Sequence, residues 1–225
     1  MCSTSCIIFE AKNLSREDVA GKRVLEVGSY DVNGSIRPLI NSWKPSEYVG
    51  VDMVAGPGVD VICNAECLVE KFGKERFDVV ICTSVLEHVR EWRKVVSGIK
   101  NVCRRGGVML ISVPSYGFKY HGYPYDFWRY ELEDMKNIFS DCKILSLEKD
   151  DNARGVFTKF EKPAGFVEKD LSNYKLYSIV VDRRLKGITD KDLGSLRFIY
   201  LSLKWKFRVL IFETGKTFLR FFDVF

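Results

Sequence analysis

Histidine is scarce in this sequence, and one familiar glycine spacing is missing. Only two histidines, His88 and His121, occur among the 225 residues, so few side chains are available for imidazole chemistry. A nicotinamide-dependent oxidoreductase with a Rossmann domain carries a G-x-G-x-x-G turn after its first strand. Here Gly28 is followed only by Gly34, and this spacing argues against that class of enzyme.

Long apolar runs are also absent from the C-terminal part. Val209 to Phe212 is its longest apolar run, and charged residues such as Lys204 and Arg208 interrupt the pattern before it. A transmembrane helix needs about 20 mostly apolar residues, so no membrane span is predicted there. The N-terminus has no basic start and only Cys6 to Phe9 as an apolar run, which is not typical of a signal peptide.

The seven cysteines are odd in number and show no disulfide-like pattern, which favours reduced thiols in the cytoplasm. Cys2 and Cys6 together with Cys63 and Cys67 offer four thiolates, the number that suits zinc or an iron-sulfur cluster. Three-residue gaps are nonspecific, however, and a buried cysteine ordinarily behaves as a small hydrophobic residue. No metal site is therefore predicted.

Two apolar segments, each with an acid at its end, are the most informative feature. Arg23 to Val27 contains Glu26 and breaks at Gly28, and Tyr48 to Asp52 repeats that form about one βαβ unit later. Ligands of open α/β sheets lie beyond the carboxyl ends of the strands, so Glu26, Gly28 and Asp52 should meet in one crevice. A carboxylate at Asp52 suits two ribose hydroxyls, although Gly28 and Asp52 are also what ordinary turns contain.

At this point the chain resembles the class I S-adenosylmethionine (SAM) dependent methyltransferases, in particular the type-11-like group. The resemblance continues through Phe77 to Val89 and Arg105 to Pro114, and covers roughly residues 20 to 163. It implies an α/β fold, a Rossmann-like and mostly parallel seven-stranded sheet with helices on both faces, and SAM as cofactor. One departure is that Tyr30 and Val32 stand where the family usually has further glycines.

The pattern predicts strands over residues 23–27, 48–52, 59–62, 77–82, 107–113, 142–148 and 155–160. Helices are expected after a Ser15 cap and over residues 32–40, 65–72 and 88–103, and a further helix should begin near Glu131.

The resemblance also implies which residues contact SAM. The expected cofactor-binding residues are Glu26, Gly28, Ser29, Asn33, Gly34, Asp52, Met53, Asn64, Ala65, Thr83, Ser84 and His88. Asn64 has an alternative role as a helix cap, and His88 as a helix residue whose ring is satisfied by the backbone.

The segment between residues 116 and 130 is too aromatic for an ordinary solvated loop. His121 and Asp126 have the chemistry of a general base, and Tyr123, Trp128 and Arg129 are expected to bind the substrate. The structural alternative is that Asp126 pairs with Arg129 while the aromatic rings pack the loop onto the sheet.

The net charge of +5 is concentrated at the C-terminus, because residues 183–225 hold ten Lys/Arg against four Asp/Glu. Residues 1–163 are expected to form the methyltransferase domain, and residues 164–225 a mostly helical, basic and aromatic extension. Within it, residues 196–225 show an apolar stripe that would pack on the body, self-associate or contact an anionic membrane surface as a peripheral protein. A nucleic-acid partner is not expected, since no nucleic-acid module is visible.

These observations predict a SAM-dependent methyltransferase. By resemblance to group members, the acceptor is expected to be a small molecule or a glycan, methylated at oxygen. The alternative is a noncatalytic SAM-binding or assembly protein that uses the aromatic loop and the tail as interaction surfaces.

Overall fold

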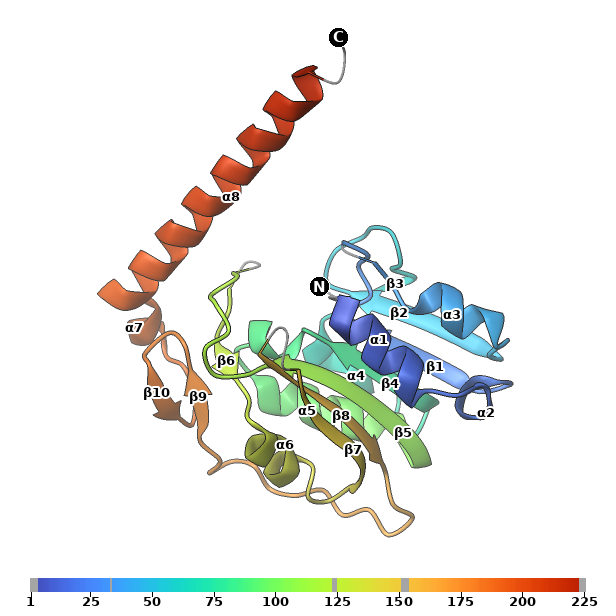
Figure 1. Ribbon diagram of the computed structural model, residues 1–225. Coiled ribbons are helices and arrows are strands. Elements are labelled where there is room, and N and C mark those ends of the chain that lie inside the picture. Colours follow the sequence, from blue (N-terminus) through green and yellow to red (C-terminus); the bar gives the residue numbers. More distant parts are fainter. Residues whose placement is uncertain (1–3, 33, 123–124, 151–153, 223–225) are drawn as a thin grey trace.

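A seven-stranded sheet forms the centre of the molecule (Figure 1). The computed structural model describes residues 4–32, 34–122, 125–150 and 154–222, with side chains up to residue 212. The strand order is β3-β2-β1-β4-β5-β8-β7, and β8 alone runs antiparallel to its neighbours. The bounds are β1 Arg23–Val27, β2 Glu47–Asp52, β3 Val61–Ile62, β4 Phe77–Thr83, β5 Cys103–Pro114, β7 Lys143–Asp150 and β8 Gly155–Glu161. The predicted Rossmann-like sheet is confirmed.

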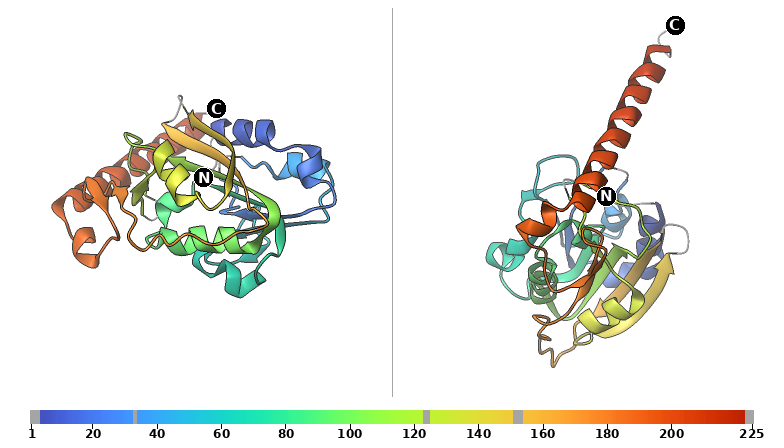
Figure 2. Two further views of the ribbon diagram at one scale, coloured as in Figure 1. Left: turned by 90° about the horizontal axis from the view of Figure 1, so that it is seen from below. Right: turned by 90° about the vertical axis from the view of Figure 1, so that its left-hand side faces the viewer.

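Helices cover both faces of this sheet (Figure 2). One apolar cluster joins the sheet to α1 Thr4–Asn13, α2 Arg16–Val19 and α3 Arg37–Ser42. The other joins it to α4 Leu68–Phe72, α5 Trp92–Val102 and α6 Leu132–Ile138, and includes the 3-10 turns η1 Ala65–Cys67 and η2 Leu86–His88. Alternation along β1 explains the division, because Val24 belongs to the first cluster and Leu25 and Val27 to the second.

Two helix predictions were wrong in their bounds. The helix expected from residue 32 begins only at Arg37, because Asp31 accepts a hydrogen bond from the Gly34 N–H in a turn and Pro38 stands in the first helical turn. The helix expected over residues 88–103 begins only at Trp92, after a 3-10 turn at Leu86–His88, and ends at Val102, where β5 begins. Helix α1 was not predicted at all, since Cys6 to Phe9 is too short an apolar run to reveal a period.

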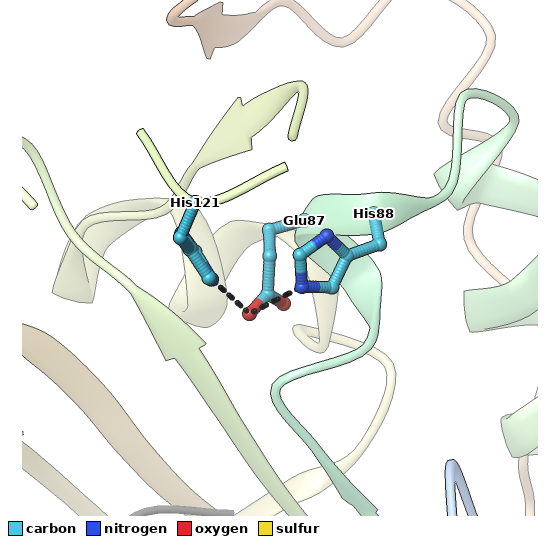
Figure 3. Close-up of side chains that lie close together, drawn as sticks. All are labelled: Glu87, His88 and His121. Carbon is cyan, nitrogen blue, oxygen red and sulfur yellow. Dashed lines mark ion pairs between the residues drawn. The ribbon is translucent and has the colours of Figure 1, made fainter. Parts of the chain in front are cut away.

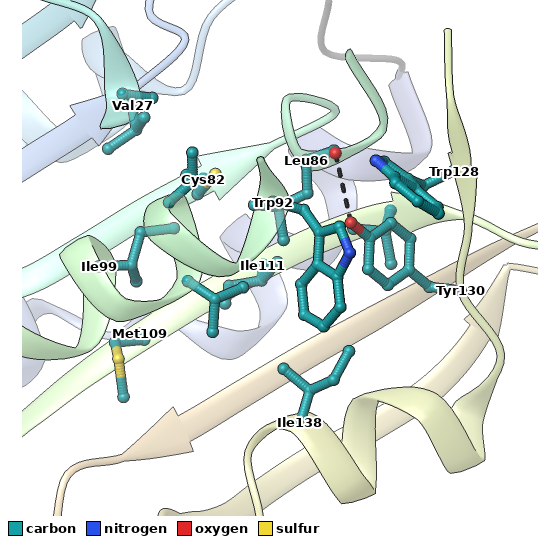
Figure 4. Close-up of a cluster of buried hydrophobic side chains, with 14 of the residues drawn as sticks. Val27, Cys82, Leu86, Trp92, Ile99, Met109, Ile111, Trp128, Tyr130 and Ile138 are labelled. Atoms are coloured by element: carbon teal, nitrogen blue, oxygen red, sulfur yellow. Dashed lines mark hydrogen bonds between the residues drawn. The ribbon is translucent and has the colours of Figure 1, made fainter. Parts of the chain in front are cut away.

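The larger apolar cluster connects the segments that follow β4 and β5 (Figure 4). Trp92, Trp128 and Tyr130 have no measurable exposure. The Tyr130 hydroxyl donates a hydrogen bond of 3.2 Å to the Leu86 carbonyl, and the Trp128 indole donates one of 3.0 Å to the Val89 carbonyl. These bonds fix the aromatic loop against the turn after β4.

The C-terminal extension is less helical at its start than expected. β9 Leu176–Ser178 pairs with β10 Arg183–Leu185 and with β6 Trp128–Arg129 of the aromatic loop, which makes a second, three-stranded sheet. Helices α7 Asp190–Leu193 and α8 Leu196–Phe222 follow, and α8 extends away from the body (Figures 1 and 2). None of the described helices is long and apolar enough to cross a bilayer.

Candidate functional site

Three of the predicted cofactor residues follow neighbouring strands at one edge of the sheet. Val27 of β1 pairs with Val51 of β2 on one side and with Cys82 of β4 on the other. Gly28, Asp52 and Thr83 are the next residues along these strands, so the register alone brings them side by side. They lie at the carboxyl ends of parallel strands, where open α/β sheets bind ligands.

The turn after β1 depends on a bare backbone at Gly28. This glycine has φ +79°, and a Cβ built on it would come within 2.2 Å of Val85 Cγ2. The N–H groups of Gly28 and Ser29 both donate to the Val51 carbonyl, at 2.8 and 3.0 Å. Ser29 is buried, and its Oγ has no hydrogen-bond partner among the described residues. This Oγ faces Gly50 of β2, since it would lie 2.7 Å from a Cβ built on that glycine.

Asp52 and the residue after it are accessible from the crevice. The Asp52 carboxylate accepts weak hydrogen bonds from the Tyr30 and Val54 N–H groups, at 3.4 and 3.3 Å. Met53 is 67% exposed. Gly34 lies beside Ile7 of α1, whereas Asn33 lies outside the described residues.

Glu26 points toward the α1 and α3 side of the sheet rather than into open solvent. It is 6% exposed and accepts a 2.5 Å hydrogen bond from the Tyr48 hydroxyl. Burial raises the pKa of Glu26 to about 7, against the opposing effect of that bond. Glu10 of α1 is also fully buried, and burial raises its pKa well above the ordinary value, with Cys6 and Glu26 adding to the effect.

Asn64 serves as the helix cap that was its alternative role. Its Oδ1 accepts a hydrogen bond of 2.9 Å from the Glu66 N–H at the start of η1. The side chain is exposed, and Ala65 beside it is buried at 8% exposure. The Asn64 carbonyl, which was expected to contact the cofactor, is therefore partly engaged within the protein.

Helix α1 closes over the ends of β4 and β5. Thr83 is buried, and Ser84 after it has φ +53°, a left-handed conformation that is uncommon for a residue with a side chain. Cys6 Sγ of α1 lies 3.3 Å from Ser112 Oγ and 4.0 Å from Ser84 Oγ. The N-terminal helix is thus part of the wall of the crevice.

Both histidines of the chain meet one buried carboxylate just beyond β4 (Figure 3). Glu87 Oε1 lies 3.6 Å from His121 Nε2 and 3.8 Å from His88 Nε2, and the two imidazole rings have centroids 4.9 Å apart. Nδ1 of His121 lies 2.9 Å from Asp126 Oδ2, and Nδ1 of His88 lies 2.6 Å from the Tyr125 carbonyl. The predicted pair His121 and Asp126 is therefore in hydrogen-bonding contact.

In this cluster, interactions between charged groups together shift the pKa values more than burial does. Burial alone would lower the pKa of His121, but the carboxylates of Asp126 and Glu87 raise it to about 9. Burial would raise the pKa of Asp126, yet Arg129 and His121 hold it well below its usual range. The pKa of Glu87 is lowered in the same way by His121 and His88.

Two of the residues expected to bind substrate are enclosed by the protein. Arg129 is 1% exposed, and its guanidinium donates to Asp126 and to the carbonyls of Phe118, Lys119 and Trp128. Trp128 has no exposure. Both make the internal contacts that the alternative interpretation expected, although Arg129 also lines the groove described below, and Tyr123 lies outside the described residues.

A separate groove of about 570 Å³ lies beside the C-terminal end of β5. Its lining includes Ser115, Tyr116, Lys149, Arg154 and Tyr177, and none of the predicted cofactor residues. It is therefore distinct from the crevice at the ends of β1, β2 and β4.

Two residues of the site were not selected from the sequence. Glu87 stands directly before His88, and this adjacent acid was the available signal. Glu10 is an acid that directly follows the apolar run ending at Phe9, but without the helix α1 nothing indicated that it would be buried.

A family described as "Methyltransferase domain" matches residues 9–145, more than half of the chain. The matched range includes the second half of α1, the crevice residues and the whole aromatic loop.

Among proteins of known function, the chain is similar to ubiquinone biosynthesis O-methyltransferases of Pseudomonas. The protein of Pseudomonas entomophila is 32% identical over 111 residues, which are 43% of this chain and 46% of that protein. The chain thus spans about half the length of the curated relatives it matches.

Solved structures share the fold at low identity. The SAM-dependent methyltransferase of Mesorhizobium loti is 14% identical with a TM-score of 0.56, over 71% of this chain and 98% of that one. The 1,6-didemethyltoxoflavin-N1-methyltransferase of Burkholderia thailandensis, solved with its acceptor and S-adenosylhomocysteine, is 15% identical with a TM-score of 0.55. That match covers 69% of this chain and 75% of the other.

Proposed function

Because this chain belongs to the methyltransferase-domain family, we propose that it transfers a methyl group from SAM to a hydroxyl oxygen of a small-molecule acceptor. By family and fold it is a class I SAM-dependent methyltransferase, and SAM is its cofactor. The contact between His121 and Asp126 beyond the end of β4 is the observation that carries the choice of a hydroxyl acceptor.

The crevice residues fit SAM. Asp52 supplies a carboxylate for the ribose hydroxyls, and Ser29 supplies a buried hydroxyl without a partner among the described residues. When bound, SAM supplies a methyl group on a positively charged sulfur. The buried carboxyl groups of Glu26 and Glu10 line the same side of the crevice, where they favour a cationic ligand once they ionise.

His121 is the proposed general base. Because the carboxylates raise its pKa to about 9, the fraction of His121 that can accept a proton increases as pH rises toward that value. Asp126 holds its Nδ1 and leaves Nε2 facing Glu87 and the crevice side of the loop. As the acceptor oxygen forms its bond to the methyl carbon, the carbon–sulfur bond breaks with its electron pair on sulfur, and the hydroxyl proton passes to His121. A base is needed for a hydroxyl, because the methylated oxygen would otherwise keep a proton.

An oxygen acceptor also agrees with the name of the Pseudomonas relatives, which are O-methyltransferases. A flat or ring-shaped acceptor is favoured by the aromatic loop, where the ring of Tyr125 is 46% exposed and the Tyr125 carbonyl contacts Nδ1 of His88. Such rings stack on aromatic or sugar faces. A small phenol or a glycan hydroxyl is therefore the acceptor class to test.

Calorimetric titration with SAM and S-adenosylhomocysteine is the first test. Micromolar binding that is lost in Asp52→Ala supports the proposed cofactor site. Asp182→Ala is a matched control, since this exposed carboxylate lies on the far extension and should leave binding unchanged. Absence of binding by the wild-type protein would overturn the proposal.

Turnover on phenolic and sugar acceptors tests the base. We expect His121→Ala to lower kcat by about 10²- to 10⁴-fold with little change in SAM affinity, as is usual for loss of a general base. Lys119→Ala, an exposed side chain in the same loop, should keep wild-type kcat. Equal kcat in both variants would remove His121 from the mechanism.

We propose that α8 makes a contact outside the methyltransferase body, at an anionic membrane surface. Phe198 packs at the base of the helix near Tyr120, but Leu203 and Phe207 are 61% and 63% exposed. The start of α8 packs on the larger apolar cluster through Phe198, Leu201 and Trp205, whereas Leu203 and Phe207 remain exposed to an outside partner. Basic side chains lie between these apolar residues, the composition of a helix that binds lipid headgroups.

A further inference from the structure

The cluster of Glu87, His88 and His121 has the donor set of a metal centre (Figure 3). One carboxylate oxygen and two imidazole nitrogens lie within 4.8 Å of one another. A tetrahedral zinc site with bonds of about 2.0–2.2 Å separates its donor atoms by roughly 3.4 Å. The observed 3.6 and 3.8 Å from Glu87 Oε1 to the two Nε2 atoms exceed that separation by only a few tenths of an ångström.

The histidines are oriented as metal ligands usually are. Nδ1 of His121 has two acceptors, Asp126 Oδ2 at 2.9 Å and the Lys119 carbonyl at 3.3 Å, and Nδ1 of His88 has the Tyr125 carbonyl at 2.6 Å. Acceptors on Nδ1 place the proton there and leave the Nε2 lone pair available. In both rings Nε2 is the atom that faces Glu87.

One oxygen of the Glu87 carboxylate is left for a further ligand. Glu87 is 1% exposed, and its Oε2 has no hydrogen-bond partner among the described residues. A buried carboxylate oxygen without a partner is costly, and each such atom in a native protein needs an explanation. A cation shared by both oxygens of Glu87 would supply the missing interaction.

Few other side chains among the described residues could compete for a metal ion. The thiols of Cys6, Cys63, Cys82, Cys103 and Cys142 are buried in the two apolar clusters, and Cys67 is exposed on η1. None of the cysteines that the structure describes joins a second group of metal-binding side chains. Two nitrogens and a carboxylate favour a borderline cation such as zinc over magnesium, which prefers oxygen ligands.

We propose that Glu87, His88 and His121 bind a divalent transition-metal ion, for which zinc is the best fit, with its open position toward the methyl acceptor. The location of that open position rests on the proposed function, but the binding of the ion does not. An acceptor hydroxyl bound there would lose its proton to water, because a cation lowers the pKa of a coordinated hydroxyl. The acceptor oxygen would then form the bond to the methyl carbon while the carbon–sulfur electron pair goes to sulfur. In the zinc-bound protein His121 would be a ligand, and it is the base only in the protein without zinc.

The test is metal binding by the whole chain after dialysis against a chelator. Titration calorimetry with zinc chloride should give one ion per chain, and cobalt(II) should give the visible spectrum of a nitrogen- and oxygen-bound tetrahedral ion. We expect Glu87→Gln and His88→Ala to weaken zinc binding at least tenfold. Asp126→Asn, which removes the carboxylate that holds Nδ1 of His121 and also pairs with Arg129, should weaken it by about 10- to 100-fold.

Two matched variants separate this site from adventitious binding. Glu91→Gln removes an exposed carboxylate four residues after Glu87, and Cys67→Ser removes the exposed thiol. Both should bind zinc as the wild type does. Thermal unfolding and S-adenosylhomocysteine binding of each variant check that it is folded.

The outcomes are distinct for the two proposals. No zinc binding by the wild type, or wild-type affinity in Glu87→Gln and His88→Ala, overturns the metal site. Zinc bound by the cluster in a protein that binds neither SAM nor S-adenosylhomocysteine keeps the metal site and overturns the proposed function. Turnover that survives chelation unchanged removes the metal from the reaction.

Discussion

Asp126 and Arg129 form a buried, two-point ion pair at the centre of the aromatic loop. Nη1 of Arg129 donates to Oδ1 of Asp126 at 2.6 Å, and Nη2 donates to Oδ2 at 2.7 Å. Oδ2 is also the atom that holds His121. The orientation of the proposed base therefore depends on an arginine that contacts no part of the crevice.

Replacing Arg129 is expected to destabilise the protein. Arg129→Ala removes the guanidinium that is paired with the buried Asp126 carboxylate, and breaking a buried ion pair typically costs about 3–5 kcal/mol. Arg129→Lys cannot form the two parallel bonds and should give an intermediate loss. Urea denaturation measures both changes.

Arg184→Ala is a suitable control for Arg129→Ala, because Arg184 also pairs with a buried carboxylate, Asp134, but is partly exposed. Its loss of stability should be smaller. Wild-type stability of Arg129→Ala together with a raised KM for the acceptor would contradict the structural role and restore the substrate-binding prediction.

Gly28 gives a second prediction, on steric grounds. Gly28→Ala combines a left-handed φ with a clash at Val85, and overpacking of this kind typically costs about 1–3 kcal/mol in addition to the strain. Gly21 has a similar φ of +69° but nothing within 4 Å of its built Cβ. Gly21→Ala should therefore lose only the stability that the left-handed backbone conformation costs, with no contribution from a clash.

The clash can be tested separately by a double variant. Val85→Ala removes the atom that lies 2.2 Å from the added methyl group, whereas Val85 Cβ would be 3.6 Å away. Gly28→Ala with Val85→Ala should thus recover part of the stability and of the S-adenosylhomocysteine affinity lost in Gly28→Ala. A double variant less stable than the sum of the single ones would show that the turn fails for another reason.

Patterns local to one segment predicted the sheet well. β1, β4 and β8 are mostly apolar and mostly buried, and Gly28 directly follows the last residue of β1. The two-stranded part of the extension was missed, because β9 and β10 have three residues each and gain their partners only from the aromatic loop. Three residues are too few to show a period.

The candidate site could be predicted only in part, for a related reason. Asp126, His121 and Arg129 lie close in sequence, so their chemistry was visible together. Glu87 is 34 residues before His121, and their contact depends on how the aromatic loop folds back on η2 through the Phe127 N–H and the Glu87 carbonyl. Burial decides the role of such groups, and burial is a property of the whole fold.

Glu26 gives a prediction on pH. Burial raises its pKa from 4.5 to about 7, so the folded protein binds more protons than the unfolded chain between these values. Stability attributable to Glu26 is therefore fully present below about pH 4.5 and is lost as pH rises through 7, by about 3 kcal/mol in total.

Glu26→Gln keeps an acceptor for the Tyr48 hydroxyl but cannot ionise. Without cofactor, the stability difference between the variant and the wild type should shift by about 3 kcal/mol in favour of the variant between pH 4.5 and pH 8. Denaturant unfolding at a series of pH values measures this. A difference that is flat with pH would mean that Glu26 is not held neutral in the folded protein.

Helix α8 gives a prediction on membrane binding. Lys204, Lys206 and Arg208 are exposed on the same stretch as Leu203 and Phe207. Each basic residue near an anionic surface contributes about 1 kcal/mol, so changing all three to Gln should weaken binding to phosphatidylserine vesicles about a hundredfold. Phe207→Glu should weaken it as well, because the apolar side chain would no longer enter the headgroup region.

Vesicle sedimentation of the full chain measures the affinities, with neutral vesicles and high salt as conditions under which binding should fall. Lys191→Gln, a basic residue of α7 outside this stretch, serves as the control and should bind as the wild type does. If the wild-type protein does not bind the vesicles and instead sediments as a dimer, and Phe207→Glu dissociates that dimer, then α8 is an interface between two copies of the chain.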